Sequence, residues 1–158
     1  MRSEELSEGE YYHIYNRGVD KREVFSDEDD IARFYQSMLL FNRNETIGSI
    51  YEHSFVLKRS KDEMSEELGN PIPKLVEIVA YCLNPNHYHF ILKQVSKNGI
   101  SKFMHKLGVG YTNYFNENNT RTGSLFQGRF KSVHINSNDY LLYLSAYVNL
   151  NNHVHRIG

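Results

Sequence analysis

A short turn constrains the fold of this chain more than any other feature. Residues 84–86 read Asn-Pro-Asn, which is typical of a turn. They lie between an apolar stretch at 75–83 and a stretch rich in aromatic and β-favouring residues at 87–93. The pattern therefore predicts a β-hairpin in the middle of the chain.

The second strand of this hairpin is predicted to have two different sides, because successive side chains of a strand alternate between its faces. His87 and His89 share one side with Ile91, and an apolar row faces the other way: Tyr88, Phe90 and Leu92. Two imidazoles at i and i+2 can direct nitrogen atoms at one divalent cation. A bare His-x-His is more often a pair of surface histidines on a half-buried sheet, so the pair alone leaves both interpretations open.

The size and composition are those of a globular protein. The chain has 158 residues, 40% of them hydrophobic and 23% charged, which suits one domain with its own core. Its one cysteine, Cys82, excludes an intramolecular disulfide and a cysteine-rich zinc module. Neither a signal-peptide pattern nor a long apolar run is found, so we expect a soluble, cytoplasmic protein without a membrane partner.

The net charge of −1 conceals an asymmetry along the chain. Residues 1–86 carry 10 Lys and Arg against 17 Asp and Glu, a balance of −7, whereas residues 87–158 carry 8 against 2, a balance of +6. Six of the eight histidines also lie in this second part. A basic, histidine-rich half suits a phosphate-bearing partner, although halves of a sequence need not correspond to faces of the fold.

The remaining elements follow from hydrophobic spacing and from capping and turn residues. We expect strands at 11–19 and 130–135, helices at 27–42, from 99 or 100 to 116, and from 137 or 138 to about 151, and an insertion at 43–74. Ser26 is the predicted N-cap of the first helix. The order of these elements predicts an α+β fold, a ferredoxin-like or RRM-like antiparallel sheet with helices on one face. In that fold His87 and His89 lie on a central strand.

The last predicted helix offers further polar groups. Tyr143, Tyr147 and Asn151 are spaced i, i+4 and i+8, so they share one face. An apolar stripe lies beside them, formed by Leu141, Leu144 and Val148. The tyrosines could equally fill the core, and Asn151 could be a C-cap.

Five blocks, in order along nearly the whole chain, resemble the single-tyrosine HUH transposases, in particular the REP-associated branch of the insertion-sequence group. The blocks are 12–18 (YHIYNRG), 80–90 (AYCLNPNHYHF), 110–116 (GYTNYFN), 123–132 (GSLFQGRFKS) and 143–151 (YLSAYVNLN). The resemblance implies an enzyme that cleaves and rejoins single-stranded DNA, recognises hairpin DNA, and acts as a monomer or a homodimer.

The resemblance also implies roles for individual residues. His87 and His89 would bind Mg²⁺ or Mn²⁺, and Asn151 would be a third ligand. Tyr147 on the C-terminal helix would be the nucleophile that forms a 5′-phosphotyrosine. Such a reaction suits these groups, because a cation beside the phosphate can neutralise charge as it develops and covalent capture conserves the bond for rejoining.

Further candidates follow from the residues themselves. Arg129 and Lys131 alternate with Phe130 on the fourth predicted strand, which suits phosphate contacts but also ordinary charge on an edge strand. Additional candidates for DNA contacts are Arg17, Lys102 and Lys106, and alternative nucleophiles are Tyr111 and Tyr114. Two other functions stay open: a metal-dependent phosphodiesterase that uses water, and a non-catalytic nucleic-acid-binding module of the same fold.

Overall fold

The computed structural model describes residues 5–44, 73–141 and 144. Within them, four strands form one antiparallel sheet in the order β2-β3-β1-β4. The strands are β1 (Tyr11–Arg17), β2 (Val76–Asn84), β3 (His87–Gln94) and β4 (Lys131–Ile135). A short 3-10 turn, η1 (Val19–Lys21), and helix α1 (Glu28–Leu40) follow β1, and helix α4 (Gly99–Asn118) follows β3.

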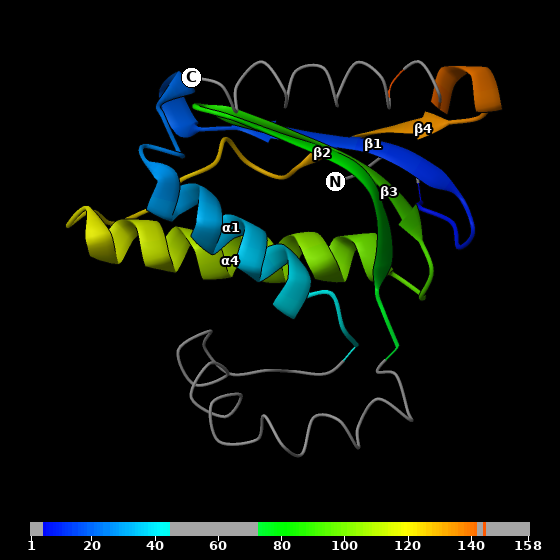
Figure 1. Cartoon of the computed structure of the whole chain (residues 1–158), viewed down its shortest axis with the longest axis horizontal. Helices are drawn as coiled ribbons and strands as arrows, with labels where there is room; N and C mark the ends of the chain where they lie inside the picture. The colour runs from blue at the N-terminus through cyan, green and yellow to red at the C-terminus, as the bar shows by residue number, and fades with distance from the viewer. Residues whose placement is uncertain (1–4, 45–72, 142–143, 145–158) are drawn as a thin grey trace.

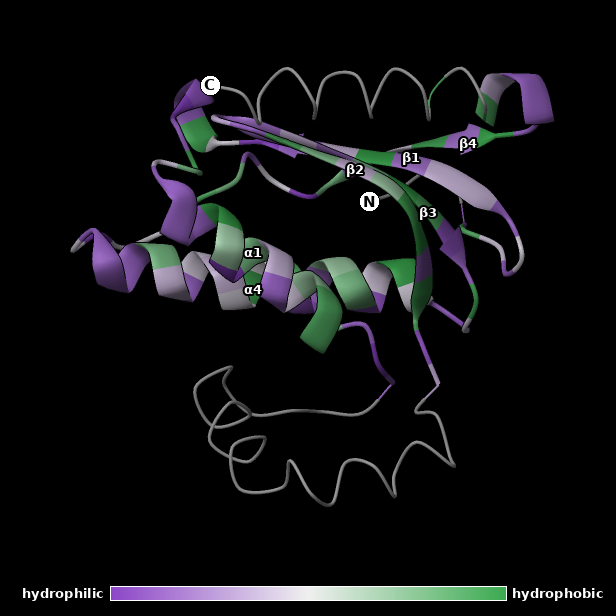
Figure 2. Cartoon of the chain, in the orientation of Figure 1, coloured by the Kyte–Doolittle hydropathy of each residue, from purple (hydrophilic) through white to green (hydrophobic). Residues whose placement is uncertain are grey.

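Both helices lie on the same face of the sheet (Figure 1). The main hydrophobic core fills the space between these two layers, with large aromatic side chains at its centre: Phe34, Phe90, Phe103 and Tyr111. Figure 2 shows apolar and hydrophilic residues interleaved along α1 and α4, as expected of helices that bury one side. The α+β fold class, the ferredoxin-like strand order and the central position of β3 are therefore confirmed.

The opposite face of the sheet carries a second, smaller apolar cluster. Its buried members come from three strands and from the segment after β4: Ala80, Cys82, Ile91, Ile135 and Leu144. Leu141 packs against them. Two residues of the predicted apolar stripe, Leu141 and Leu144, thus lie against the sheet face that does not carry α1 and α4.

The first helix begins one residue later than expected. Asp27, not Ser26, is its N-cap, and the Asp27 carboxylate accepts a hydrogen bond of 2.9 Å from the backbone N–H of Asp30. The Asp30 carboxylate in turn accepts from the N–H of Ser26 at 2.8 Å. Asp caps a helix about as well as Ser, and its charge also complements the helix dipole, which favours Asp27 as the cap.

The two ends of the predicted insertion meet. The N–H of Asn44 donates to the carbonyl of Pro73 at 3.1 Å, and the Asn42 side chain holds the start of β2 through the N–H groups of Leu75 and Val76. A segment whose ends are this close can lengthen without disturbing the sheet.

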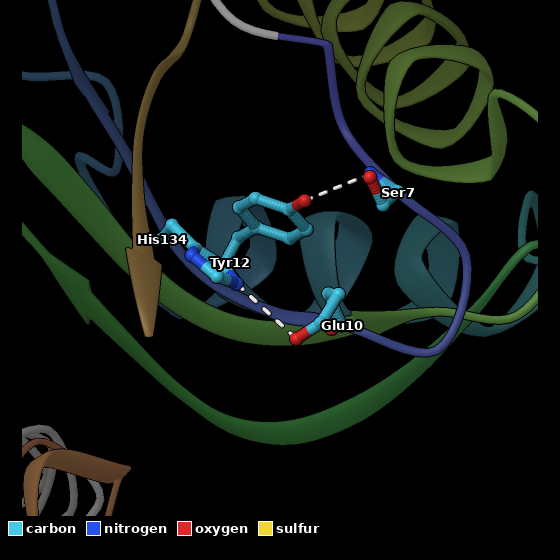
Figure 3. A network of polar contacts seen from close by, with 4 residues as sticks. All are labelled: Ser7, Glu10, Tyr12 and His134. Atoms are coloured by element: carbon cyan, nitrogen blue, oxygen red, sulfur yellow. Dashed lines mark hydrogen bonds and ion pairs between the residues drawn. The ribbon is translucent and has the colours of Figure 1, made fainter. Parts of the chain in front are cut away.

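The segment before β1 is fastened beside edge strand β4 (Figure 3). The N–H of Ser7 donates to the Tyr12 hydroxyl at 2.8 Å, and the rings of Tyr12 and His134 lie 5.2 Å apart. The Nε2 atom of His134 is 3.2 Å from a carboxylate oxygen of Glu10. These contacts attach the N-terminal segment to a strand that lacks a partner on its outer side within the described sheet.

Candidate functional site

The two histidines of the His-x-His motif lie side by side on β3, on the sheet face opposite α1 and α4. Their ring centroids are 5.1 Å apart and their planes are perpendicular. Residues directly opposite one another in antiparallel strands share a face. Across the sheet, His87 lies opposite Asn84 of β2 and Arg17 of β1, and His89 lies opposite Cys82 and Tyr15.

A cavity of about 530 Å³ opens beside His87 and His89. It is lined by Tyr15, Asn16, Arg17, Lys21, Asn86, His87, Tyr88, His89, Gln127 and Lys131. Three of these residues are cationic, namely Arg17, Lys21 and Lys131, and none is acidic. A concave surface with one sign of charge concentrates ligands of the opposite sign, so this cavity favours an anion.

The Arg17 guanidinium is held in place at the cavity. Its Nε donates to Oε1 of Gln127 at 2.6 Å, while the backbone N–H of Gln127 donates to the carbonyl of Arg17 at 2.8 Å. Lys131 is brought nearby because it pairs with Tyr15 at the start of β4. Fixed guanidinium geometry is what bidentate recognition of a phosphate needs.

Both ring nitrogens of His87 contact side-chain amides. Its Nδ1 is 2.7 Å from Oδ1 of Asn86, and its Nε2 is 3.0 Å from Nδ2 of Asn84. Nδ2 of Asn84 also lies 3.3 Å from Sγ of Cys82. The Oδ1 atom of Asn84 is buried and has no hydrogen-bond partner among the described residues.

His89 is paired with a third histidine. Its Nδ1 is 3.0 Å from Nε2 of His13, and the two rings stack with centroids 5.2 Å apart. Burial, and then the charges that His13 and His87 would carry, lower the pKa of His89 to about 4. Burial also lowers the pKa of His13. Both rings are therefore neutral at pH 7, which is the form that binds metal ions.

The other sequence-predicted cations lie away from this cavity. Arg129 lines a separate cavity of about 560 Å³ between α4 and residues 124–130. Lys102 and Lys106 lie on α4, and Nζ of Lys106 donates to the carbonyl of Arg43 at 2.9 Å. The fold thus brings Arg17 and Lys131 to the histidines but not Arg129, Lys102 or Lys106.

The two alternative nucleophiles lie on α4, across the sheet from the face that carries the histidine pair. Tyr111 is buried on the core-facing side of α4, and its hydroxyl donates to the carbonyl of Val24 at 2.5 Å. The Tyr114 hydroxyl donates to the carboxylate of Asp30 at 3.2 Å. Burial and then the Asp30 charge raise the pKa of both phenols, which disfavours the phenolate.

The remaining predicted site residues, Tyr147 and Asn151, lie outside the described residues. The segment that leads toward them begins as predicted: residues 138–141 are helical, and the Ser137 hydroxyl accepts from the N–H of Tyr140 at 3.2 Å. Leu144 is buried on the sheet face that carries His87 and His89.

Sequence reasoning missed several residues of the site. His13 and Tyr15 alternate with Ile14 on β1, so they share one face of that strand. With the register of β1 against β3 in hand, this alternation predicts that both lie on the face of His87 and His89. Lys21 reaches the cavity from the short turn η1 and Gln127 from the loop before β4, and neither segment is long enough to carry a periodic signal. Among the described residues, no group of three or more His, Cys, Asp or Glu side chains is arranged to hold a metal ion. None of the helices described there is long and apolar enough to cross a membrane.

Comparisons with known proteins identify the family. Residues 50–151 match the family model described as "Transposase IS200 like". A solved REP-associated tyrosine transposase bound to a REP hairpin has a TM-score of 0.58 at 12% identity, over 98% of this chain and 73% of that one. A suspected transposase from Deinococcus radiodurans R1 has a TM-score of 0.48 at 11% identity, over 96% and 98% of the two chains. No curated protein sequence matches. Because the family model spans well over half of the residues and includes the histidine pair, this chain belongs to the IS200-like transposase family.

Proposed function

We propose that this transposase cleaves and rejoins single-stranded DNA through a covalent 5′-phosphotyrosine at Tyr147. The observation that carries the proposal is the cavity of about 530 Å³ in which His87 and His89 lie beside Arg17, Lys21 and Lys131. Family membership supports transposition. The burial of Leu144 on the same sheet face supports a position for Tyr147, three residues later, near these histidines.

The donor atoms present fit a divalent cation. Nδ1 of His87 contacts Asn86, and in the tautomer in which Nδ1 of His89 donates to His13, the ligand atom of both rings is Nε2. Because Nδ2 of Asn84 lies 3.0 Å from Nε2 of His87, the Asn84 amide must turn away when a cation binds. The buried Oδ1 of Asn84, which lacks a partner among the described residues, adds an amide oxygen beside them. We propose His87, His89 and Asn151 as ligands of Mg²⁺ or Mn²⁺, with Mn²⁺ favoured by two imidazoles. Bound there, the cation supplies a Lewis acid for the scissile phosphate.

In the proposed reaction the phenol oxygen of Tyr147 attacks phosphorus. The bond from that oxygen to phosphorus forms as the bond to the 3′ oxygen breaks. The phenol loses its proton and the departing oxygen gains one, which leaves a free 3′-hydroxyl. Because the ordinary pKa of tyrosine is about 10, the phenol is mostly protonated at neutral pH and needs stabilisation as it loses the proton. Arg17, Lys21 and Lys131 hold the phosphate oxygens through charge-assisted hydrogen bonds.

The proposed DNA partner is a single strand that carries a hairpin. The solved transposase with this fold holds a REP hairpin, and we extend that partner to this chain as a proposal. We further propose that the chain is one HUH transposase domain with an insertion at residues 43–74, and that it acts in the cytoplasm as a monomer or a homodimer. In a dimer Tyr147 could serve either its own histidines or those of the partner.

Covalent capture tests this function. Hairpin oligonucleotides labelled at the 3′ end are incubated with the protein and Mn²⁺ or EDTA and resolved on a denaturing gel. We expect a labelled protein–DNA adduct that EDTA, Tyr147→Phe and His87→Ala each abolish. Tyr140→Phe is the matched control, because Tyr140 lies in the helical turn at residues 138–141, where its backbone N–H donates to the Ser137 hydroxyl, and it is absent from the lining of the histidine cavity. Cleaved ends without an adduct would indicate hydrolysis by water, and binding without cleavage would indicate a non-catalytic module; either result contradicts the proposal.

A further inference from the structure

The turn before β3 is tied to the segment after β1. The backbone N–H of Gly18 donates to the carbonyl of Asn86 at 2.9 Å, and the N–H groups of Val24 and Phe25 both donate to the carbonyl of Pro85. Between these points lies η1, where Asp20 and Lys21 have left-handed backbone angles, with φ of 54° and 59°. Non-glycine residues adopt this conformation only where their surroundings hold them in it.

The left-handed turn directs a backbone carbonyl at a side chain of the site. Nδ2 of Asn86 lies 3.3 Å from the carbonyl oxygen of Lys21, and Oδ1 of the same amide lies 2.7 Å from Nδ1 of His87. A backbone carbonyl can only accept a hydrogen bond. The NH₂ group of Asn86 must therefore face Lys21, and its oxygen must face His87.

This orientation fixes the proton on the histidine ring. An amide oxygen also only accepts, so Nδ1 of His87 must carry the hydrogen. In the neutral ring the lone pair is then at Nε2, where Nδ2 of Asn84 lies 3.0 Å away as a donor. The contacts of Asn86 with Lys21, of Asn86 with His87, and of Asn84 with His87 all agree on one tautomer, Nδ1–H. Turning either amide around would place two acceptors or two donors against each other.

We propose that Asn86 is a positioning residue that holds His87 in the Nδ1–H tautomer, so that Nε2 is the atom presented to a cation. The backbone carbonyl of Lys21 is the fixed point from which the amide of Asn86 is oriented. The cation-binding consequence rests on the proposed function, whereas the tautomer is a property of the metal-free protein. Neighbours that orient a ligand histidine typically change metal affinity by roughly 10- to 100-fold when they are removed.

Nitrogen NMR of the metal-free protein tests the tautomer directly. Two-bond ¹H–¹⁵N correlations distinguish a protonated from a bare imidazole nitrogen, and His87→Gln identifies the signals of His87. We expect Nδ1 protonated and Nε2 bare in the wild type and in Asn86→Asp, which keeps an acceptor. Asn86→Ala should shift the ring toward the other tautomer and weaken Mn²⁺ binding, measured by calorimetry, by roughly 10- to 100-fold.

Asn119→Ala is the matched control, because within the described residues the Asn119 side chain donates to the carbonyl of Phe115 at the end of α4 and does not line the histidine cavity. It should leave both the tautomer and Mn²⁺ affinity unchanged. A wild-type His87 with Nε2–H would overturn the proposal, as would an Asn86→Ala protein with unchanged tautomer and Mn²⁺ affinity. If Asn86→Ala does not fold, the wild-type and Asn86→Asp spectra still decide. Loss of the DNA adduct with an unchanged tautomer would count against the proposed function and not against this assignment.

Discussion

Acid should destabilise this fold through His89. Burial, and then the charges that His13 and His87 would carry, lower its pKa from 6.5 to about 4. A histidine whose pKa is lower in the folded chain takes up a proton more readily when the chain unfolds. Its stabilising contribution is therefore complete above pH 6.5 and is lost as the pH falls from 6.5 through 4.

The size of this effect follows from the shift. One pKa unit corresponds to about 1.4 kcal/mol, so the full shift limits the contribution of His89 to the free energy of unfolding to about 3.4 kcal/mol. The ring is only half-buried and solvent screens its charge, so we expect about 1–2 kcal/mol. Nδ1 of His89 bonds His13 at 3.0 Å, so the lost stability includes this contact once both rings are protonated.

Urea unfolding from about pH 7.5 to about pH 4, in EDTA and followed by circular dichroism, measures the effect. Stability of the wild type should fall more steeply than that of His89→Gln, which cannot titrate. His105→Gln is the control, because His105 is exposed on α4 and lies outside the histidine cavity. Equal pH dependence in the wild type and His89→Gln would refute the reasoning.

Other predictions concern the helix glycines and the cavity cations. Gly108→Ala should raise the free energy of unfolding by about 0.5–1 kcal/mol, because a Cβ at this position meets nothing within 4 Å. Gly110→Ala should not stabilise the protein, because a Cβ there would lie 2.8 Å from the Phe41 ring. Thermal unfolding of the two variants measures the difference. Arg17→Gln and Lys131→Gln should each weaken binding of hairpin DNA and reduce its salt slope by about 1. Lys102→Gln, on α4, should change the affinity and the salt slope less. An equal loss of affinity for the three variants would contradict the proposal that DNA phosphates bind in the histidine cavity.

The sequence predicted the hairpin and its two faces because alternation on a strand needs only local information. The Asn-Pro-Asn turn and the apolar row of β3 left one arrangement of the hairpin, which the structure confirms. The predictions from local sequence differed from the structure at the ends of helices and strands. Helix α4 has 20 residues and extends to Asn118 although it contains two internal glycines. Packing against the core stabilises it. At one of these glycines, Gly110, the ring of Phe41 lies close to the helix backbone.

The site was predictable only where strands build it. Arg17 and Lys131 meet the histidines through strand register. Arg129 was expected to act with Lys131, but β4 begins at Lys131 and the preceding Gly128 has a φ of +67°, so Arg129 turns toward the other cavity. Lys21 depends on a left-handed turn that Asp20 tolerates but that neither valine nor lysine in η1 favours.

Mass spectrometry of the trapped protein–DNA adduct tests the tyrosine mechanism most directly. After digestion with nuclease and protease, a residual nucleotide should be found on the peptide that contains Tyr147, joined through a phosphodiester to its phenol oxygen. The modification should be absent with His89→Ala and in EDTA. A nucleotide on a different tyrosine, or cleaved DNA with every tyrosine unmodified, would contradict a Tyr147 phosphotyrosine intermediate.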